Sequence, residues 1–318
     1  MNNKILIFGI IALLTLSCKT LKDGWDNLNL FPVSQDVELG KQVYDEINAN
    51  QIEFPKVPET GNEELYSYIN GIVQKILNSG KVEYSKDFAW KITLINDIKT
   101  QNAFATPGGY IFVYTGLIKF LDSEDQLAGV LGHEIAHASK RHSTKQLTKS
   151  LGLQVLADAA LGKQETVKQV ATALISLSFS RAHETQADSM SVIYLCPTDY
   201  NANGASAFFK KIKDQPTPPS WLSTHPNPSN RIENIDSKHK ALNCAGKSSY
   251  VSQYNKIKLL LDKIIPPPPK VDNKKTLPNT NSNKKTNPEK DKMNKPVPSQ
   301  NKGTEGQNKK IEKPGGGK

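Results

Sequence analysis

The feature that most constrains this chain is the sequence His-Glu-Ile-Ala-His at residues 133–137. Two histidines four positions apart fall on the same face of a helix, one turn from each other. Both imidazoles can then reach a single Zn²⁺ at about 2.0–2.1 Å. Glu134 projects beside the metal, where its carboxylate suits a general base for metal-assisted hydrolysis. The motif therefore predicts a catalytic zinc helix, and the alternative is a core helix whose histidines only form hydrogen bonds.

The residues around the motif favour a buried helix. Ser123 and Gln126 have the spacing of a capping box, in which each side chain bonds the backbone of the other. Apolar residues recur at helical spacing after them. We therefore expect one helix from about 123 to 142.

A third zinc ligand must come from elsewhere, because catalytic sites usually have three protein ligands and a water. Glu184 is the best candidate, since it lies in a strongly helical pattern over 166–195. Asp188, one turn further on the same face, can accept a hydrogen bond from a zinc-bound imidazole. Arg181 and Arg231 are two of the three arginines in a chain that otherwise uses lysine. A guanidinium suits partly buried carboxylate pairing, so we expect both beside the ligands or in the substrate groove, with two surface arginines as the alternative.

The remaining histidines have different surroundings. His225 lies in a loop that can fold over the cleft, where it would donate to the oxyanion of a tetrahedral intermediate or approach the metal. In the second case it would be a fourth ligand that latches the enzyme off. His142 comes five residues after His137, off the ligand face, and we expect a cap or surface position for it. We expect His183 to point away from the site and His239 to be solvated.

The stretch before the motif helix predicts a small sheet. Residues 90–98 and 110–113 are strand-like, and Pro-Gly-Gly at 107–109 predicts a turn between strands. An exposed sheet edge can hold an extended peptide beside a metal by taking it up as another strand. We assign residues 102–113 to this edge, with a plain structural hairpin as the alternative. The residues expected to bind substrate are Asn102, Ala103, Phe104, Gly108 and Gly109.

The N-terminus has the form of an export signal. A basic start is followed by an apolar run from Ile5 to Leu16 and by Ser17-Cys18, which resembles a bacterial lipoprotein cleavage site. The run is too short for a normal transmembrane span. We expect residues 1–17 to be removed and Cys18 to be lipidated, and ordinary signal cleavage is the alternative. The protein would then be anchored in the cell envelope facing the periplasm, in the outer membrane rather than the inner.

Composition divides the rest of the chain. We expect a linker over 18–34, one domain over 35–263 and a disordered tail, rich in Lys, Pro and Asn, over 264–318. Thirteen lysines and five acidic residues in 266–318 contribute +8 of the net charge of +10, so the charge does not indicate nucleic-acid binding. The tail is either a spacer drawn to anionic lipid or cell wall, or a solubilising end without a partner.

Two cysteines remain after Cys18, and neither has the spacing of a zinc site. In an oxidising envelope, Cys196 and Cys244 would form one disulfide that closes the C-terminal part of the domain. Two unrelated thiols are the alternative, and the sequence leaves both open.

Taken in order, these motifs resemble the HtpX/BepA family of metallopeptidases, which includes the Oma-type and CAAX prenyl proteases. The resemblance covers roughly residues 35–245. It implies an α+β, mainly α, zincin-like fold of the gluzincin kind, with a small sheet edge beside the active-site helix. It also implies one Zn²⁺ per subunit, held by His133, His137 and Glu184, with Glu134 as the base. Envelope members of the family degrade misfolded or misassembled proteins, and some act like chaperones.

The function that this resemblance implies is zinc-dependent endopeptidase activity on proteins, with membrane contact through Cys18. The sequence predicts neither the membrane helices of HtpX nor the tetratricopeptide repeats of BepA. One alternative is a zinc-containing chaperone or assembly factor that cleaves little. Another is a lipoprotein whose metal is a structural staple with four protein ligands and no water.

Overall fold

The structure is a computed structural model that describes residues 29, 31–213, 215–226 and 230–267. The expected signal segment 1–17, the lipidation site Cys18 and the tail beyond 267 lie outside the described residues. Within the described ranges, no helix is both long enough and apolar enough to cross a membrane.

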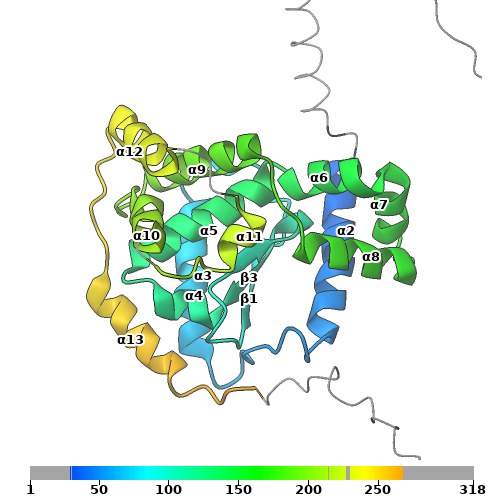
Figure 1. Ribbon diagram of the computed structural model, residues 1–318, viewed down its shortest axis with the longest axis horizontal. Helices are drawn as coiled ribbons and strands as arrows, with labels where there is room; N and C mark the ends of the chain where they lie inside the picture. Colours follow the sequence, from blue (N-terminus) through cyan, green and yellow to red (C-terminus); the bar gives the residue numbers. More distant parts are fainter. Residues whose placement is uncertain (1–28, 30, 214, 227–229, 268–318) are drawn as a thin grey trace, which may run out of the picture. The chain divides into compact units, whose positions relative to one another are not determined.

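Helices make up most of the fold and surround a small sheet (Figure 1). The helices are α2 (Val33–Ala49), α3 (Glu63–Leu77), α4 (Thr115–Phe120), α5 (Glu124–Ser139), α6 (His142–Leu151), α7 (Leu153–Ala160), α8 (Gln164–Ile175), α9 (Arg181–Leu195), α10 (Gly204–Lys213), α11 (Trp221–Thr224), α12 (Arg231–Leu242) and α13 (Val251–Leu261). The strands are β1 (Lys91–Ile95), β2 (Ala103–Ala105) and β3 (Tyr110–Tyr114), and the 3₁₀ turn η1 (Pro107–Gly109) joins β2 to β3.

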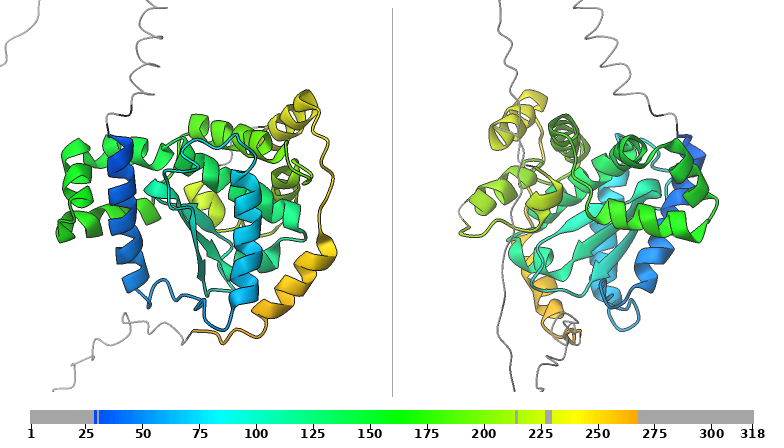
Figure 2. Two further views of the ribbon diagram at one scale, coloured as in Figure 1. Left: turned by 180° about the vertical axis from the view of Figure 1, so that it is seen from behind. Right: turned by 45° about the vertical axis from the view of Figure 1, so that its right-hand side comes forward.

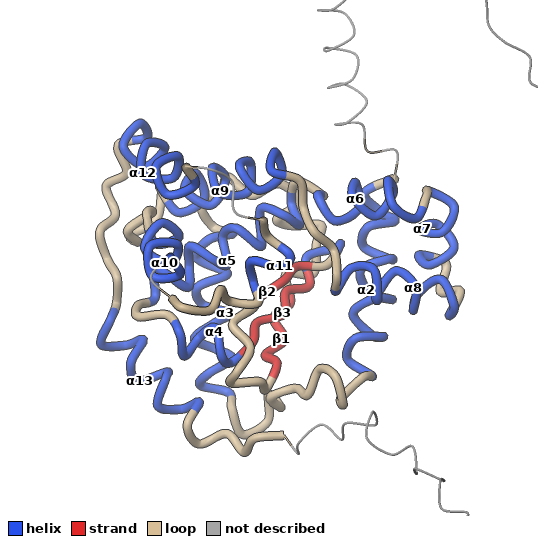
Figure 3. Tube along the Cα trace, viewed as in Figure 1, coloured by secondary structure: helices blue, strands red, loops and turns tan. Residues whose placement is uncertain are grey.

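The three strands form a mixed sheet in the order β1-β3-β2 (Figure 3). β1 runs parallel to β3, and β2 runs antiparallel to it. The predicted edge over 102–113 is therefore correct for β2 and wrong for β3. β3 is the central strand because β1, which comes earlier in the chain, pairs with its other side.

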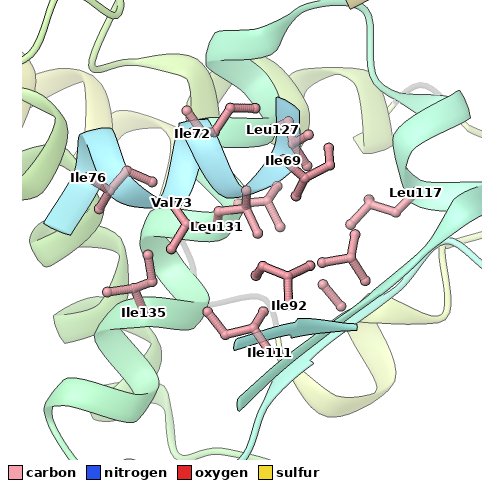
Figure 4. Packing of buried hydrophobic residues seen from close by; sticks show 14 of the residues in the cluster. Ile69, Ile72, Val73, Ile76, Ile92, Ile111, Leu117, Leu127, Leu131 and Ile135 are labelled. Atoms are coloured by element: carbon pink, nitrogen blue, oxygen red, sulfur yellow. The ribbon is translucent and has the colours of Figure 1, made fainter. Parts of the chain in front are cut away.

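The sheet separates two apolar clusters, because successive side chains of a strand point to opposite faces. On one face, Ile92 of β1 and Ile111 of β3 pack against α3 and α5 (Figure 4). On the other face, Phe104 and Phe112 belong to a cluster that includes residues of α2, α6, α7 and α8. The motif helix α5 thus lies against the sheet, with its His-Glu-Ile-Ala-His segment in the core.

Two glycines of α5 set how closely its neighbours approach. A Cβ on Gly129 would lie 2.3 Å from the backbone nitrogen of Ala205 in α10. A Cβ on Gly132 would lie 2.8 Å from Oγ of Ser191 in α9, and that hydroxyl donates to the carbonyl of Gly129 at 2.7 Å. The absence of side chains at these two positions brings α9, which carries Glu184, directly against the motif helix.

The predicted helix over 123–142 is wrong at its C-terminal end. α5 stops at Ser139, Arg141 adopts a left-handed conformation (φ 58°, ψ 36°), and α6 begins at His142. The Arg141 guanidinium donates to the buried carboxylate of Asp36 and to the carbonyl of Phe31, both at the start of α2 or just before it. These contacts with α2 stabilise the reversal of the chain. They are long-range, so the local helical pattern of the sequence cannot predict them.

The predicted capping box does not form. The Ser123 hydroxyl donates to the carboxylate of Asp125, and Oε1 of Gln126 accepts from the backbone N–H of Asp122 at 3.1 Å. The helix start was still placed correctly, because both side chains bond groups at that end of the helix.

The continuous helix predicted over 166–195 is interrupted. α8 ends at Ile175 and α9 begins at Arg181. The Ser180 hydroxyl accepts from the backbone N–H of His183 at 3.2 Å and caps α9. This break lets α8 pack with α2 while α9 packs with α5, so the two halves of the apolar pattern serve different clusters.

Candidate metal centre

Four buried side chains converge where α5, α9 and the residue after α11 meet. They are His133 and His137 of α5, Glu184 of α9, and His225, and one ligand atom from each lies within 4.8 Å of all the others. Nε2 of His133 and Nε2 of His137 are 2.9 Å apart, and Nε2 of His137 lies 3.3 Å from Oε1 of Glu184. Ligands of a tetrahedral zinc at about 2.05 Å lie about 3.3 Å from each other. These distances therefore match a divalent cation site.

The charges of these groups also fit a cation. Burial lowers the pKa of His133, His137 and His225 well below the ordinary value, so all three imidazoles stay neutral and keep a lone pair. Oε1 of Glu184 and Nε2 of His225 are buried and have no hydrogen-bond partner. Burial raises the pKa of Glu184 to about 7, although the neighbouring His225 and Arg231 lower it. Unpartnered buried acceptors are costly, and a bound cation would remove that cost.

His133 is oriented by Asp188, whose carboxylate is ion-paired with Arg231. Its Nδ1 lies 2.9 Å from Oδ1 of Asp188, so the carboxylate accepts the Nδ1 proton and turns Nε2 toward the other ligands. Nη2 of Arg231 donates to Oδ1 of Asp188 at 2.7 Å and lies 3.0 Å from Oε2 of Glu184, and Nε forms an ion pair with Oδ2 of Asp188 at 2.7 Å. Asp188 and Arg231 thus lie beside the candidate ligands, and their supporting role stays a prediction.

His142 is buried, so its predicted surface position is wrong. Its Nδ1 lies 3.1 Å from Nδ1 of His137, and its Nε2 lies 2.8 Å from Oε1 of Gln186. His183, predicted to point away, stacks on the His142 ring with 4.3 Å between centroids. The sequence argument missed these positions because it continued α5 through Arg141, which in fact reverses the chain.

Glu134 lies beside the ligands but is bonded differently. Its Oε1 accepts from Nε1 of Trp221 at 3.2 Å and lies 3.4 Å from Nε2 of His225, and its Oε2 has no hydrogen-bond partner. Burial and the nearby Glu184 raise the pKa of Glu134 well above its ordinary value, while Trp221 and the backbone N–H of Ala105 lower it. A buried carboxylate with a free oxygen beside a cation site is suited to accept a proton.

The segment that carries His225 covers the site. The rings of Trp221 and His225 stack in parallel with 4.1 Å between centroids. Nδ1 of His225 lies 3.2 Å from the carbonyl oxygen of Trp221, which can only accept, so Nε2 keeps the lone pair. With its proton on Nδ1, His225 turns the Nε2 lone pair toward the ligand cluster and can bind a metal. The backbone N–H of Trp221 donates to the carbonyl of Gln101 at 3.1 Å, which attaches the segment to the residues just before β2.

The edge strand β2 lies beside Glu134, but only part of the predicted substrate contact is available there. Phe104 pairs with Phe112 of β3, its ring stacks on the Phe112 ring at 4.8 Å, and it belongs to the core. Its predicted contact with substrate is therefore wrong. Hydrogen-bonded pairs alternate along an antiparallel ladder, so Ala103 and Ala105 turn their backbone groups away from β3. Oδ1 of Asn102 accepts from the N–H of Ala103 at 2.9 Å.

Three further predicted site residues lie elsewhere. Gly108 and Gly109 are buried in η1 with φ of 72° and 82°, where a Cβ on Gly108 would lie 3.0 Å from the carbonyl oxygen of Asp36 and a Cβ on Gly109 would lie 3.0 Å from Phe88. This indicates a packing role in place of the predicted substrate contact. Arg181 is exposed in the first turn of α9 and does not lie beside the ligands, whereas a place in the substrate groove stays a prediction.

Cys196 and Cys244 form a disulfide. The bond joins the C-terminal end of α9, which carries Glu184 and Asp188, to the segment that follows α12, which carries Arg231. Of the two possibilities that the sequence left open, the structure shows the bridge.

The fold and this site define a metallopeptidase of the zincin type, with a His/Glu cluster for a divalent metal. The family model of Peptidase family M48 matches residues 65–239, and the chain belongs to that family. These findings confirm the resemblance and the fold class that the sequence indicated.

Curated relatives agree with this assignment. The mitochondrial metalloendopeptidase OMA1 of Schizosaccharomyces pombe is 28% identical over 177 residues, which cover 53% of this chain and 51% of the relative. The β-barrel assembly-enhancing protease of Escherichia coli is 26% identical over 244 residues, which cover 71% of this chain and 48% of the relative. The chain thus spans about half the length of these two relatives.

Proposed function

We propose that this protein is a zinc-dependent endopeptidase of the bacterial cell envelope that hydrolyses misfolded or misassembled proteins. The observation that carries the proposal is the position of Glu134, a buried carboxylate with one unpartnered oxygen, beside the convergent ligand atoms of His133, His137 and Glu184. Two imidazoles and one carboxylate are the ligand set of many catalytic zinc sites. When bound, zinc supplies a Lewis acid that polarises the scissile carbonyl and lowers the pKa of water.

Glu134 then has two tasks. It takes a proton from the attacking water, and it delivers that proton to the amine nitrogen that leaves. The Trp221 indole N–H and the Ala105 backbone N–H orient its carboxylate. Of the outward backbone groups of β2, the Ala105 N–H bonds Glu134, the Ala105 carbonyl accepts from the Ser143 hydroxyl at 3.4 Å, and the Ala103 N–H donates to Oδ1 of Asn102. An extended substrate that adds as a strand next to Glu134 would exchange these local bonds for its own.

The described arrangement is the closed state of this site. His225 occupies a position among the ligands, and its segment is attached to Gln101 just before β2. Water and a substrate strand would therefore compete with the same short segment. We propose that the segment moves away before cleavage.

A second candidate function is a structural metal site. Four converging ligands are typical of such a site, and this observation favours it. The position of Glu134 opposes it. A structural site has no use for a further buried carboxylate with an unpartnered oxygen, and such a group costs free energy. A zinc-containing chaperone that cleaves little remains the third candidate, and the experiment below separates it.

The location is proposed from the sequence, through export by residues 1–17, lipidation at Cys18, one domain over 35–263 and a tail over 264–318. The Escherichia coli relative is named for β-barrel assembly, which supports an envelope protein as the substrate. We propose the outer membrane as the site of the anchor.

The test is the Glu134→Gln variant of the full chain. We expect it to keep stoichiometric zinc and to lose cleavage of unfolded casein by at least about 10²-fold, the usual contribution of a general base. Glu165→Gln, an exposed glutamate of α8, is the matched control and should keep both. Full cleavage by Glu134→Gln would refute the mechanism. Suppression of aggregation by a wild type that cleaves nothing would favour the chaperone.

A further inference from the structure

His142 occupies a position that the metal site itself does not require. The left-handed Arg141 reverses the chain after α5, so the first residue of α6 lies over the face of α5 that carries His137. The rings of His137 and His142 meet edge to face, with centroids 5.0 Å apart and planes at 77°. His142 is completely buried, although an imidazole is seldom placed in a core without partners.

The partners of His142 determine where its proton lies. Oε1 of Gln186 can only accept, so the hydrogen of a neutral His142 is on Nε2, 2.8 Å away. Nδ1 of His142 is then an acceptor, and Nδ1 of His137, at 3.1 Å, must be the donor. His137 therefore carries its proton on Nδ1. The lone pair of its Nε2 faces the metal position beside Glu184, whose Oε1 is 3.3 Å from Nε2.

Only one direction of this chain of hydrogen bonds is compatible with metal binding. If the Gln186 amide were turned around, its NH₂ group would donate to His142, and the proton of His142 would move to Nδ1. His137 would then accept at Nδ1 and carry its proton on Nε2, which faces the metal position. The three groups thus form a relay whose polarity sets the tautomer of a ligand.

We propose that His142, held by Gln186, is the positioning residue that keeps His137 in its metal-binding tautomer. This inference rests on the proposed metal-binding function of His137. With the Gln186 amide oxygen facing His142, each bond of the relay has one donor, so a loss at Gln186 is passed through His142 to His137.

The comparison with His133 explains why an imidazole serves here. Asp188 fixes the tautomer of His133, and the charge of Asp188 is paired with Arg231. The site already contains the carboxylates of Glu134, Glu184 and Asp188, which one divalent cation and one guanidinium would neutralise. A second supporting carboxylate would leave a net negative charge in a buried site, whereas His142 orients its ligand without adding charge.

The His142 ring is also fixed sideways. His183, one residue before Glu184, stacks on it at 12° between the planes, and Phe179 lies close to both His137 and His142. The same turn of α9 therefore supplies a metal ligand, the stacking partner of His142 and, at Gln186, the end of the relay.

The test compares two replacements of His142 in the full chain. His142→Phe keeps the ring volume and removes both nitrogens, whereas His142→Asn keeps an acceptor close to the position of Nδ1. We expect His142→Phe to raise the zinc dissociation constant about 10- to 100-fold, measured by competition with a chromophoric chelator. We expect His142→Asn to recover most of that loss. Gln186→Met should weaken zinc binding by a smaller factor, and Gln169→Met, an exposed glutamine of α8, should not change it.

A second readout is independent of metal. In the zinc-free protein, ¹⁵N-edited NMR of the imidazoles should show His137 protonated at Nδ1 in wild type and mixed in His142→Phe. An Nε2-protonated His137 in wild type, or zinc affinity of His142→Phe within threefold of wild type, would overturn the inference. If wild type bound no zinc, the proposed function would fail, and the His137 tautomer would still decide this inference.

Discussion

Arg231 and Asp188 form a two-pronged ion pair in the core, with Nε and Nη2 of the guanidinium each 2.7 Å from a different carboxylate oxygen. The arginine is 2% exposed, and its guanidinium lies over the rings of Phe209 and Trp221. Through Asp188 it acts on His133, and through Nη2 it acts on Glu184, 3.0 Å away. One side chain from α12 therefore supports two of the proposed ligands and stacks on Trp221, which in turn donates to the proposed base.

Arg231→Lys tests this geometry. Lysine keeps the charge but cannot reproduce a planar two-pronged contact, so we expect zinc affinity to fall roughly tenfold. Measurement is by chelator competition, with the exposed Arg181→Lys as the control that should bind zinc like wild type. Equal zinc affinity of Arg231→Lys and wild type would contradict a role for the planar guanidinium contact.

Arg231→Met tests the charge. The zinc-free variant should lose about 3–5 kcal/mol of unfolding free energy at neutral pH, because Asp188 would stay buried without its cation. Burial raises the pKa of Asp188 even with Arg231 present, and removing the guanidinium would raise it further. Protonated Asp188 needs no partner, so the loss should shrink as pH falls. Urea unfolding at several pH values measures this, and a pH-independent loss would exclude the charge as its cause.

His225→Ala should increase the rate of casein cleavage severalfold while weakening zinc binding. In the described arrangement His225 presents a lone pair to the ligand cluster and its segment is attached just before β2, so its removal frees a position for water. Initial rates at saturating zinc are the measurement. If His225 instead donates to the oxyanion, as the sequence also allowed, His225→Ala would lower the rate at unchanged zinc occupancy.

The Cys196–Cys244 bridge closes a segment with a sequence separation of 48 residues. Chain-entropy arguments give roughly 4 kcal/mol for a loop of that length. We expect the double Cys196→Ser, Cys244→Ser variant to unfold at lower urea concentration by that order, with zinc content unchanged under native conditions. A reductant should shift the wild type to the same midpoint and leave the variant where it is. A midpoint unaffected by either change would mean that the bridge does not stabilise the fold.

Deleting residues 266–318 should leave casein cleavage within twofold of wild type, as the proposed domain boundary requires. The last helix before that point belongs to the fold, because the Tyr254 hydroxyl donates to the carbonyl of Ile118 at 2.8 Å. A longer deletion that begins at Val251 is therefore the contrasting variant and should lower the unfolding midpoint. A loss of cleavage in the shorter deletion, with an unchanged midpoint, would show that the tail contributes to activity.

Local sequence was sufficient for the parts of this protein that depend on neighbouring residues. The spacing of His133 and His137 follows from the helical repeat, and the choice of Glu184 followed from the number of ligands that a catalytic zinc needs. The Pro-Gly-Gly turn was predictable because glycine readily adopts positive φ, which Gly108 and Gly109 do in the structure. These inferences used residues within one or two turns of each other, or a chemical requirement that one side chain meets.

The misplaced residues share a different cause. His142 was assigned to the surface because nothing within α5 indicates that Arg141 would be held left-handed by Asp36, a residue far earlier in the chain. Phe104 was assigned to the substrate because local sequence does not show how β2 pairs with β3. That pairing places the Phe104 ring in the core. The supporting contact from Trp221 to Glu134 likewise joins residues from distant parts of the sequence.

The sequence by itself indicated the family, a site for a divalent metal and the helical segments that carry its candidate ligands. Tertiary structure alone decided which residues lie beside those ligands, which strand is the edge, and that His225 lies among the candidate ligands. The physical reason is that ligand chemistry and helical periodicity are properties of a short peptide. Tautomers, buried ion pairs and coverage of the site depend on contacts between elements that only the folded chain brings within hydrogen-bond distance.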